Sequence, residues 1–127
     1  MKNRVFYDTV KLYTVHREEK KMSGRKQTVK ILHIGDLHLD SPFASLGSDG
    51  QAKANAELRR AFSRAIGYAR ENAVQIVLIA GDLFDREYYS RGTLDTVCKE
   101  MESVPDCVFV ISPGNHDPIT PHSPYKT

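Results

Sequence analysis

The chain has 127 residues, of which 40% are hydrophobic and 27% are charged, enough for one small globular domain. It contains no apolar run close to the roughly 18 residues that cross a membrane, so we expect a cytoplasmic protein with no membrane partner. The two cysteines, Cys98 and Cys107, have neither a zinc-site spacing nor the number needed for a disulfide framework, which also fits the cytoplasm.

Residues 1–28 differ from the rest of the chain in charge. Residues 1–30 contain nine Lys or Arg and three Asp or Glu, a charge of +6, whereas the remaining residues carry −4. No convincing periodicity is present, so we expect a basic, disordered leader, with a short strand or hairpin between Val5 and Val15 as the alternative. A basic arm can also contact the phosphates of nucleic acid, although a solvated tail is the commoner outcome.

Three short apolar runs rich in β-branched residues predict buried strands at residues 29–34, 75–80 and 107–111. Residues 51–72 carry apolar side chains at spacings of three and four, which predicts an amphipathic helix with Ser48 and Asp49 as capping residues. Arg59 and Arg60 lie off its apolar stripe, where we expect solvated surface, with DNA contacts as the minority alternative. Ser90 can cap a second helix that runs to about residue 102.

The order of strand, helix, strand, helix, strand predicts an α/β fold. Right-handed crossovers would place the strands parallel in one twisted sheet, with the helices packed against it. Residues 118–127 contain three prolines and no apolar periodicity. We therefore expect a disordered tail after a folded region of residues 29–117.

A polar cluster that begins with glycine follows each predicted strand. The three clusters are Gly35-Asp36-Leu37-His38, Gly81-Asp82-Leu83-Phe84-Asp85 and Gly114-Asn115-His116-Asp117. Because ligands of open α/β sheets bind beyond the carboxyl ends of the strands, we expect the clusters to meet on one rim. Asp, Asn and His side chains gathered there suit a divalent metal ion.

The polar residues of the clusters have expected roles. Asp36 and His38 are separated by one residue and would face the same ion in an extended segment. Asp82 could bridge two ions, and Asn115 would supply a neutral oxygen to the second ion. The imidazole of His116 titrates near neutral pH and is therefore free for proton transfer.

Three neighbouring residues each have two interpretations. Asp85 could orient a metal ligand or could only cap a turn. Tyr88 and Tyr89 could stack on a substrate base, or they could cover the edge of the sheet, which is more common.

In order and spacing, the three clusters resemble the first three motifs of the calcineurin-like metallophosphoesterases, over residues 29–117. The string from Gly35 to Phe43, GDLHLDSPF, more narrowly resembles the DNA repair exonuclease branch, with its SbcD-type and YhaO-type proteins. The resemblance implies the N-terminal half of a metallophosphoesterase α/β sandwich with two divalent metal ions. We expect Mn, with Mg, Fe and Zn as alternatives, and a separation of about 3.5–4 Å between the two ions.

The resemblance also implies which residues form the site. Four residues would bind metal: Asp36, His38, Asp82 and Asn115. Asp82 would be shared by both ions. His116 would stabilise the charged transition state or protonate the leaving oxygen, and Asp117 would orient His116 by accepting its ring proton.

Members of the family continue beyond their third motif, where further metal-binding histidines lie in Gly-His and Gly-His-x-His sequences that have no match here. We therefore expect a truncated chain that binds Mn weakly, hydrolyses little by itself and exposes one apolar face of its sheet. Because the family-like sequence begins only near Val29, we also hypothesise that the working protein starts at Met22.

The branch resemblance gives the leading functional hypothesis. It is a DNA exonuclease or endonuclease of the double-strand-break repair type, with DNA as substrate, an SMC-like ATPase as partner and self-association into a homodimer. One alternative is a phosphatase or small-molecule phosphodiesterase of the same superfamily. The other is a non-catalytic metal-binding remnant that acts through partners.

Overall fold

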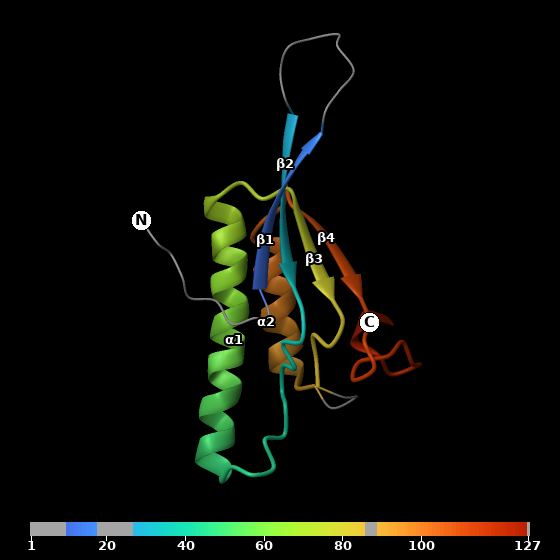
Figure 1. Cartoon of the computed structure of the whole chain (residues 1–127). Helices are drawn as coiled ribbons and strands as arrows, with labels where there is room; N and C mark the ends of the chain where they lie inside the picture. The colour runs from blue at the N-terminus through green and yellow to red at the C-terminus, as the bar shows by residue number, and fades with distance from the viewer. Residues whose placement is uncertain (1–9, 18–26, 86–88, 127) are drawn as a thin grey trace.

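The computed structural model describes residues 10–17, 27–85 and 89–126. Four strands form one sheet in which their order in space follows the sequence. They are β1 (Val10–Arg17), β2 (Gln27–Ile34), β3 (Ile76–Ala80) and β4 (Val108–Ser112). Two α-helices, α1 (Ser48–Glu71) and α2 (Arg91–Glu102), connect the last three strands, and both lie on the same face of the sheet (Figure 1).

Strands β2, β3 and β4 are parallel, which confirms the predicted α/β fold. Alternate residues of these strands point towards the helices, and the register aligns them across the sheet. Leu32 and Ile34 of β2 pair with Val77 and Ile79 of β3, and all four side chains are at most 2% exposed. The helices therefore bury one face of the sheet and fix the positions of the loops that leave the strand ends.

The predicted apolar stripe of α1 is the side that packs on the sheet. Its buried residues are Ala61, Phe62, Ala65, Ile66 and Ala69. The expected capping of this helix by Ser48 and Asp49 is wrong, because the N-cap is Gly47 and no side chain caps it. Asp49 lies in the first turn instead, where its negative charge interacts favourably with the helix dipole and stabilises α1.

Strand β1 lies at the edge of the sheet and comes from the region expected to be a disordered leader. It runs antiparallel to β2, with Val10 opposite Ile34 and Arg17 opposite Gln27. This corrects the expectation of disorder for residues 10–17 and favours the strand that was the alternative. Residues 1–9 and 18–26, including Met22, lie outside the described residues, and the division into leader, domain and tail stays a prediction.

The C-terminal segment also differs from the expected disordered tail. Residues 124–126 form a short 3-10 helix, η1 (Pro124–Lys126), and both Ser123 and Pro124 are buried. The ring of Tyr125 packs near Phe84, with 6.3 Å between the ring centroids. Proline content gave the wrong signal here because one of the three prolines, Pro124, is buried at the start of this turn.

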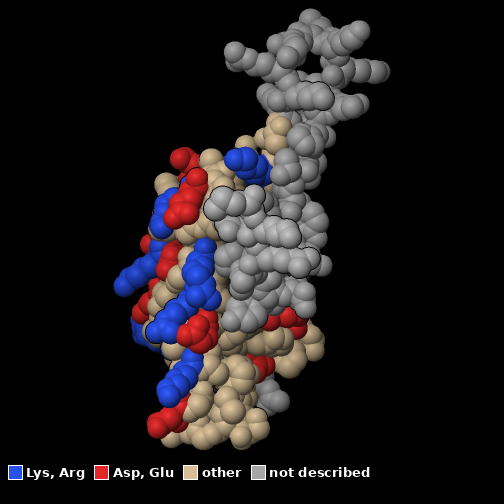
Figure 2. Space-filling view, turned by 60° about the vertical axis from the view of Figure 1, so that its left-hand side comes forward, with Lys and Arg blue, Asp and Glu red and all other residues tan. Residues whose placement is uncertain are grey.

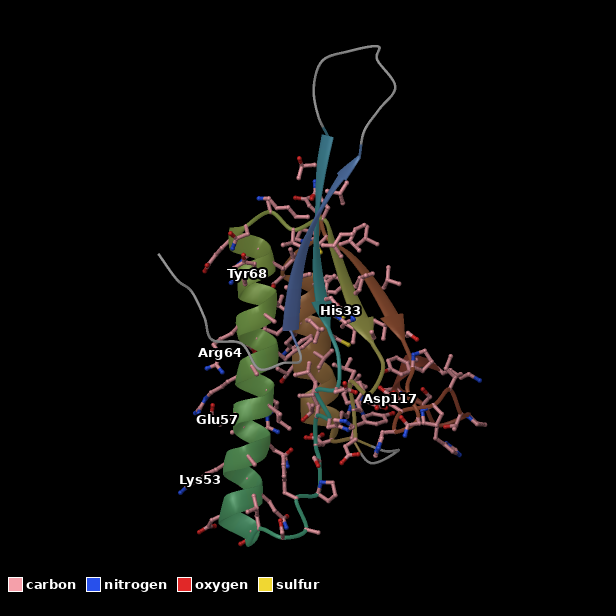
Figure 3. All side chains as sticks on the ribbon, in the orientation of Figure 1. His33, Lys53, Glu57, Arg64, Tyr68 and Asp117 are labelled. Atoms are coloured by element: carbon pink, nitrogen blue, oxygen red, sulfur yellow. The ribbon has the colours of Figure 1, made fainter. Side chains whose placement is uncertain are left out.

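The exposed side of α1 carries charges of both signs. Figure 2 shows basic and acidic side chains interspersed along this side of the molecule, and Lys53, Glu57 and Arg64 point away from the sheet (Figure 3). Arg60 forms an ion pair with Glu57, and Arg59 lies 3.4 Å from the carboxylate of Asp40. These pairs favour the expectation of a solvated surface over DNA contacts for the two arginines.

The second face of the sheet carries apolar residues, as we expected. Val108 and Val110 of β4 are 60% and 50% exposed, and Ile31, Ile76 and Leu78 beside them are half-buried. Neither α1 nor α2 covers this face (Figure 1).

Among the described residues, no helix has the length and hydropathy to cross a membrane.

Candidate metal centre

The loops that follow β2, β3 and β4 are joined by backbone hydrogen bonds beyond the carboxyl ends of the strands. The amide of His38 donates to the carbonyl of Asp82 at 2.9 Å, and the amide of Gly81 donates to the carbonyl of Ser112 at 2.9 Å. Asp117, from the third loop, lies at the same end of the sheet (Figure 3). The predicted meeting of the clusters on one rim follows from this parallel arrangement.

Three side chains from these loops form a group that could bind a metal ion. Nitrogen atoms of His38 and His116 and a carboxylate oxygen of Asp82 all lie within 4.8 Å of one another. The two imidazole rings meet edge to face, with 4.8 Å between their centroids and 87° between their planes. Asp82 is only 8% exposed. One carboxylate and two imidazoles fit Mn, Fe or Zn better than a hard ion that prefers oxygen alone.

The loop after β2 is not extended, contrary to the reasoning that paired Asp36 with His38. Asp36, His38 and Asp40 have positive φ angles of 50°, 49° and 62°, a region that Asp and His occupy more readily than most residues. His38 is half-buried and reaches the group with Asp82 and His116, whereas Asp36 is exposed. Alternation along a strand therefore does not explain how both residues would reach one ion.

Of the four predicted ligands, the structure brings His38 and Asp82 together and adds His116 to them. Asn115 is exposed in the loop beside His116, and Asp36 does not belong to this group of three. The assignment of Asp36 and Asn115 as ligands stays a prediction.

Asp85 lies beside both histidines, which favours the first of its two predicted interpretations, and it occupies the position expected of Asp117. Its carboxylate oxygen Oδ1 is 2.9 Å from Nδ1 of His116 and 3.7 Å from Nδ1 of His38. A carboxylate can only accept, so Nδ1 of His116 carries the proton and Nε2 is left for a metal ion or substrate. Burial raises the pKa of Asp85, but hydrogen bonds from Ser41 and His116 and the charges of both histidines outweigh burial and lower it.

Asp117, which is 2% exposed, instead holds two loops together through its carboxylate. Oδ1 accepts from the amides of Gly114 at 2.6 Å and Asp82 at 3.2 Å. Oδ2 accepts from the amides of Leu83 at 2.9 Å and Phe84 at 3.3 Å, and from the hydroxyl of Tyr125. We call these bonds the Asp117 clamp. They connect the loop that carries Asp82 to the loop that carries His116.

Two residues that donate to Asp117, Asp82 and Tyr125, have further contacts that fix their side chains or their protonation. Oδ1 of Asp82 accepts from the amide of His116 at 2.8 Å, so the Asp82 side chain is oriented by the third loop. Burial, the hydrogen bond to Asp117 and the charges of Asp117 and Asp82 all raise the pKa of Tyr125. The phenol therefore stays neutral and can donate to Asp117.

Gly114 is required by the close approach of the two loops. A Cβ atom placed on Gly114 would lie 2.6 Å from the amide nitrogen of Asp82 and closer still to its Oδ1 atom. Real Cβ contacts are longer than this, so no other residue fits here without displacing Asp82. The third cluster therefore begins with glycine because a side chain at this position would collide with Asp82 of the metal centre.

Comparison with known proteins shows which family the chain is similar to. The family profile described as calcineurin-like phosphoesterase matches residues 29–127. The chain belongs to this family. It is also 34% identical, over 93 residues, to YhaO of Bacillus subtilis (strain 168), an uncharacterized metallophosphoesterase. That match covers 68% of this chain and 22% of YhaO, so the chain spans about a fifth of the length of this curated relative.

The string that suggested the exonuclease branch of the calcineurin-like phosphoesterases has structural roles in this chain. Leu39 is fully buried and pairs with Phe84 in a parallel bridge. Asp40 accepts from the amide of Ser90 at 2.6 Å and from the hydroxyl of Thr93 at 2.9 Å. These residues fasten the first metal-binding loop to the second loop and to the start of α2.

We predict that Asp40→Ala lowers the free energy of unfolding by about 2 kcal/mol, because α2 loses an acceptor at its N-terminus and the hydroxyl of the buried Thr93 loses its carboxylate partner. Urea unfolding monitored by circular dichroism would measure this. The control is Asp49→Ala in the first turn of α1, which should cost about 0.5 kcal/mol or less. Equal effects of the two substitutions would contradict the role of Asp40.

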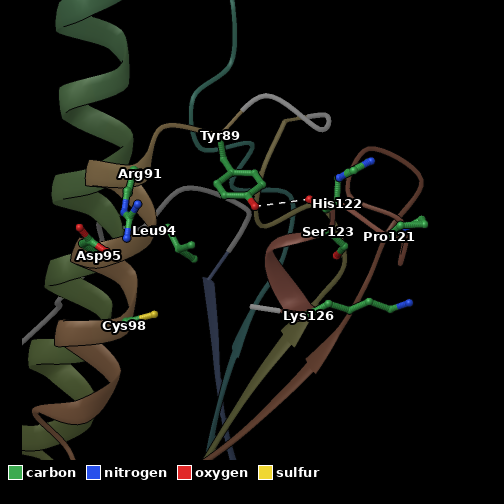
Figure 4. A pocket seen from close by; sticks show the side chains of 9 residues that line it. All are labelled: Tyr89, Arg91, Leu94, Asp95, Cys98, Pro121, His122, Ser123 and Lys126. Atoms are coloured by element: carbon green, nitrogen blue, oxygen red, sulfur yellow. Dashed lines mark hydrogen bonds between the residues drawn. The ribbon is translucent and has the colours of Figure 1, made fainter.

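Tyr89 lines a pocket of about 820 Å³ between α2 and the C-terminal segment (Figure 4). Its ring lies 5.5 Å from that of Phe84, and its hydroxyl donates to the carbonyl of His122 at 3.4 Å. This packing favours the structural interpretation of Tyr89 over base stacking, whereas Tyr88 lies outside the described residues. The other residues of the pocket come from α2 and from residues 121–126.

Proposed function

We propose that this chain is the N-terminal, metal-binding part of a metal-dependent phosphodiesterase, and that the substrate is DNA, cleaved as an exonuclease or endonuclease of the double-strand-break repair type. The observation that carries the metal-dependent part is the convergence of His38, Asp82 and His116 from three different loops. Membership of the calcineurin-like phosphoesterases supports phosphoester hydrolysis. The choice of DNA rests on the resemblance of the string from Gly35 to Phe43.

The residues present fit a divalent metal ion and a reaction at phosphorus. A bound ion would lower the pKa of a coordinated water and neutralise phosphate charge. Asp82 and His38 would hold the ion, and a hydrogen bond from the amide of His116 orients the buried carboxylate of Asp82. Asp85 keeps a proton on Nδ1 of His116, so that Nε2 can stabilise charge on the phosphate or hold a proton for the leaving oxygen. Asn115, exposed on the same loop, would help to place the phosphate.

We also propose that full activity needs metal ligands beyond these residues, since one carboxylate and two imidazoles leave the coordination of two ions incomplete. DNA, an SMC-like ATPase and a second copy of the chain are the partners proposed with the nuclease function. The exposed valines of β4 support association of some kind through the second face of the sheet.

We predict that the purified chain binds Mn²⁺ weakly in titration calorimetry and that Asp82→Asn lowers the affinity by at least about tenfold, because the site loses its central carboxylate. The control is Asp106→Asn, which changes an exposed acid outside the group. Absence of Mn²⁺ uptake, or equal uptake by the Asp82→Asn variant, would contradict a metal centre at this rim.

Hydrolysis assays with Mn²⁺ then separate the possible substrates. Single-stranded DNA, duplex DNA and a phosphate monoester are compared at equal phosphate concentration, and we expect slow cleavage of DNA that disappears in Asp82→Asn. Turnover of the monoester alone would favour a phosphatase. Metal binding without any cleavage would favour the non-catalytic remnant. Rapid cleavage of DNA by the chain alone would contradict the proposal that full activity needs further metal ligands.

A further inference from the structure

We propose that Tyr125 is a positioning residue of the metal centre, acting through Asp117 on the two loops that carry Asp82 and His116. Tyr125 lies in η1, within residues 118–127, for which the sequence predicts disorder. The inference rests on the metal centre of the proposed function and does not depend on DNA as the substrate.

The contacts of Tyr125 place its hydroxyl at the centre of the Asp117 clamp. The hydroxyl donates to Oδ2 of Asp117, the same oxygen that accepts the amides of Leu83 and Phe84. The ring packs near Phe84, which is 1% exposed. Tyr125 therefore contacts both the carboxylate and the second loop that this carboxylate orders.

The turn that presents Tyr125 is itself held in place. The amide of Tyr125 donates to the hydroxyl oxygen of Ser123 at 3.2 Å, and the amide of Lys126 donates to the carbonyl of Ser123 at 3.1 Å. Ser123 is 3% exposed. The hydroxyl of Tyr125 thus reaches Asp117 from an ordered support.

The clamp gives a route from Tyr125 to the metal group. A buried carboxylate is stable only when donors compensate for lost hydration, and Asp117 has four backbone amides and one hydroxyl. Without the hydroxyl, Oδ2 retains only the amides of Leu83 and Phe84, so fewer hydrogen bonds oppose rotation of the carboxylate. Rotation would also weaken the bonds of Oδ1 to Gly114 and Asp82, and Asp82 would then lose its fixed position.

Tyr125→Phe tests this inference, because it removes the hydroxyl and keeps the ring. The matched control is Tyr89→Phe, whose ring also packs near Phe84 but whose hydroxyl donates to the carbonyl of His122 (Figure 4). Two properties are measured on the same proteins. One is amide hydrogen exchange of the metal-free chain, resolved at Leu83, Phe84 and Gly114, and the other is Mn²⁺ affinity by titration calorimetry.

We expect Tyr125→Phe to speed exchange at these three amides by about tenfold, and to weaken Mn²⁺ binding by about tenfold, with wild-type exchange at core positions such as Val77. Tyr89→Phe should leave both properties unchanged. Faster exchange with unchanged Mn²⁺ affinity would reduce Tyr125 to a structural role and overturn the inference, as would unchanged exchange or equal effects of the two variants. A wild-type chain that takes up no Mn²⁺ would refute the metal centre itself, and with it this role of Tyr125, whereas a failure confined to Tyr125→Phe leaves the proposed function intact.

Discussion

Gly114→Ala is expected to abolish the metal centre and to lower the free energy of unfolding by about 3 kcal/mol. The added Cβ would meet the amide nitrogen and the carboxylate of Asp82 at distances that atoms do not adopt. Movement of either group would break a hydrogen bond, because the amide donates to Asp117 and the carboxylate accepts from the amide of His116. Relief of the clash must therefore separate the second loop from the third.

The matched control for Gly114→Ala is Gly92→Ala in the first turn of α2, where a Cβ would have no atom within 4 Å. That substitution should be neutral or stabilise by up to about 1 kcal/mol, because alanine favours a helix. Urea unfolding and Mn²⁺ calorimetry on both variants measure the difference. A Gly114→Ala protein with the unfolding midpoint and metal affinity of the wild type would show that the two loops are not in close contact.

The sheet and its helices were predictable because their signals are local. The strands are short apolar runs rich in β-branched residues, and the apolar stripe of α1 recurs every three or four residues, so local composition identifies the strands and periodicity identifies the helix. The rim was predictable for the same reason. Parallel strands bring their carboxyl ends together, and each of the three polar clusters directly follows a strand.

Roles within the rim were only partly predictable, because several depend on backbone turns and on contacts between distant residues. Asp117 is adjacent to His116 in sequence, which suggested a pair, but the turn directs its carboxylate to the amides of residues 82–84. Asp85, distant in sequence, accepts the hydrogen bond from the ring instead, which was one of its two predicted interpretations. Likewise, the positive φ angles of Asp36 and His38 invalidate an argument that assumed extended backbone.

The string from Gly35 to Phe43 shows how a motif can be recognised before its cause is known. In the structure, Leu39 and Asp40 secure the first loop against Phe84 and the start of α2, and neither side chain belongs to the metal group. The string therefore supports a particular loop geometry more directly than a particular substrate. For this reason the DNA assignment needs its own assay, separate from the test of metal binding.

Asp117→Asn is expected to lower the free energy of unfolding by about 3–5 kcal/mol, because the clamp depends on two oxygen acceptors. Each carboxylate oxygen accepts at least two donors. In asparagine, one of these positions becomes an NH₂ group that faces donors in either orientation of the amide. At least two buried N–H or O–H groups would then lose their acceptor.

Urea unfolding of Asp117→Asn measures this effect, and Asp106→Asn, at an exposed position, is the control that should stay within about 0.5 kcal/mol of the wild type. Combination with Tyr125→Phe sharpens the test. Because the hydroxyl of Tyr125 donates to Asp117, its removal should cost much less in the Asp117→Asn background than in the wild type, which a double-mutant cycle measures directly. Additive effects would mean that the two residues stabilise the loops independently, and the clamp would then not be the connection between the C-terminal segment and the metal centre.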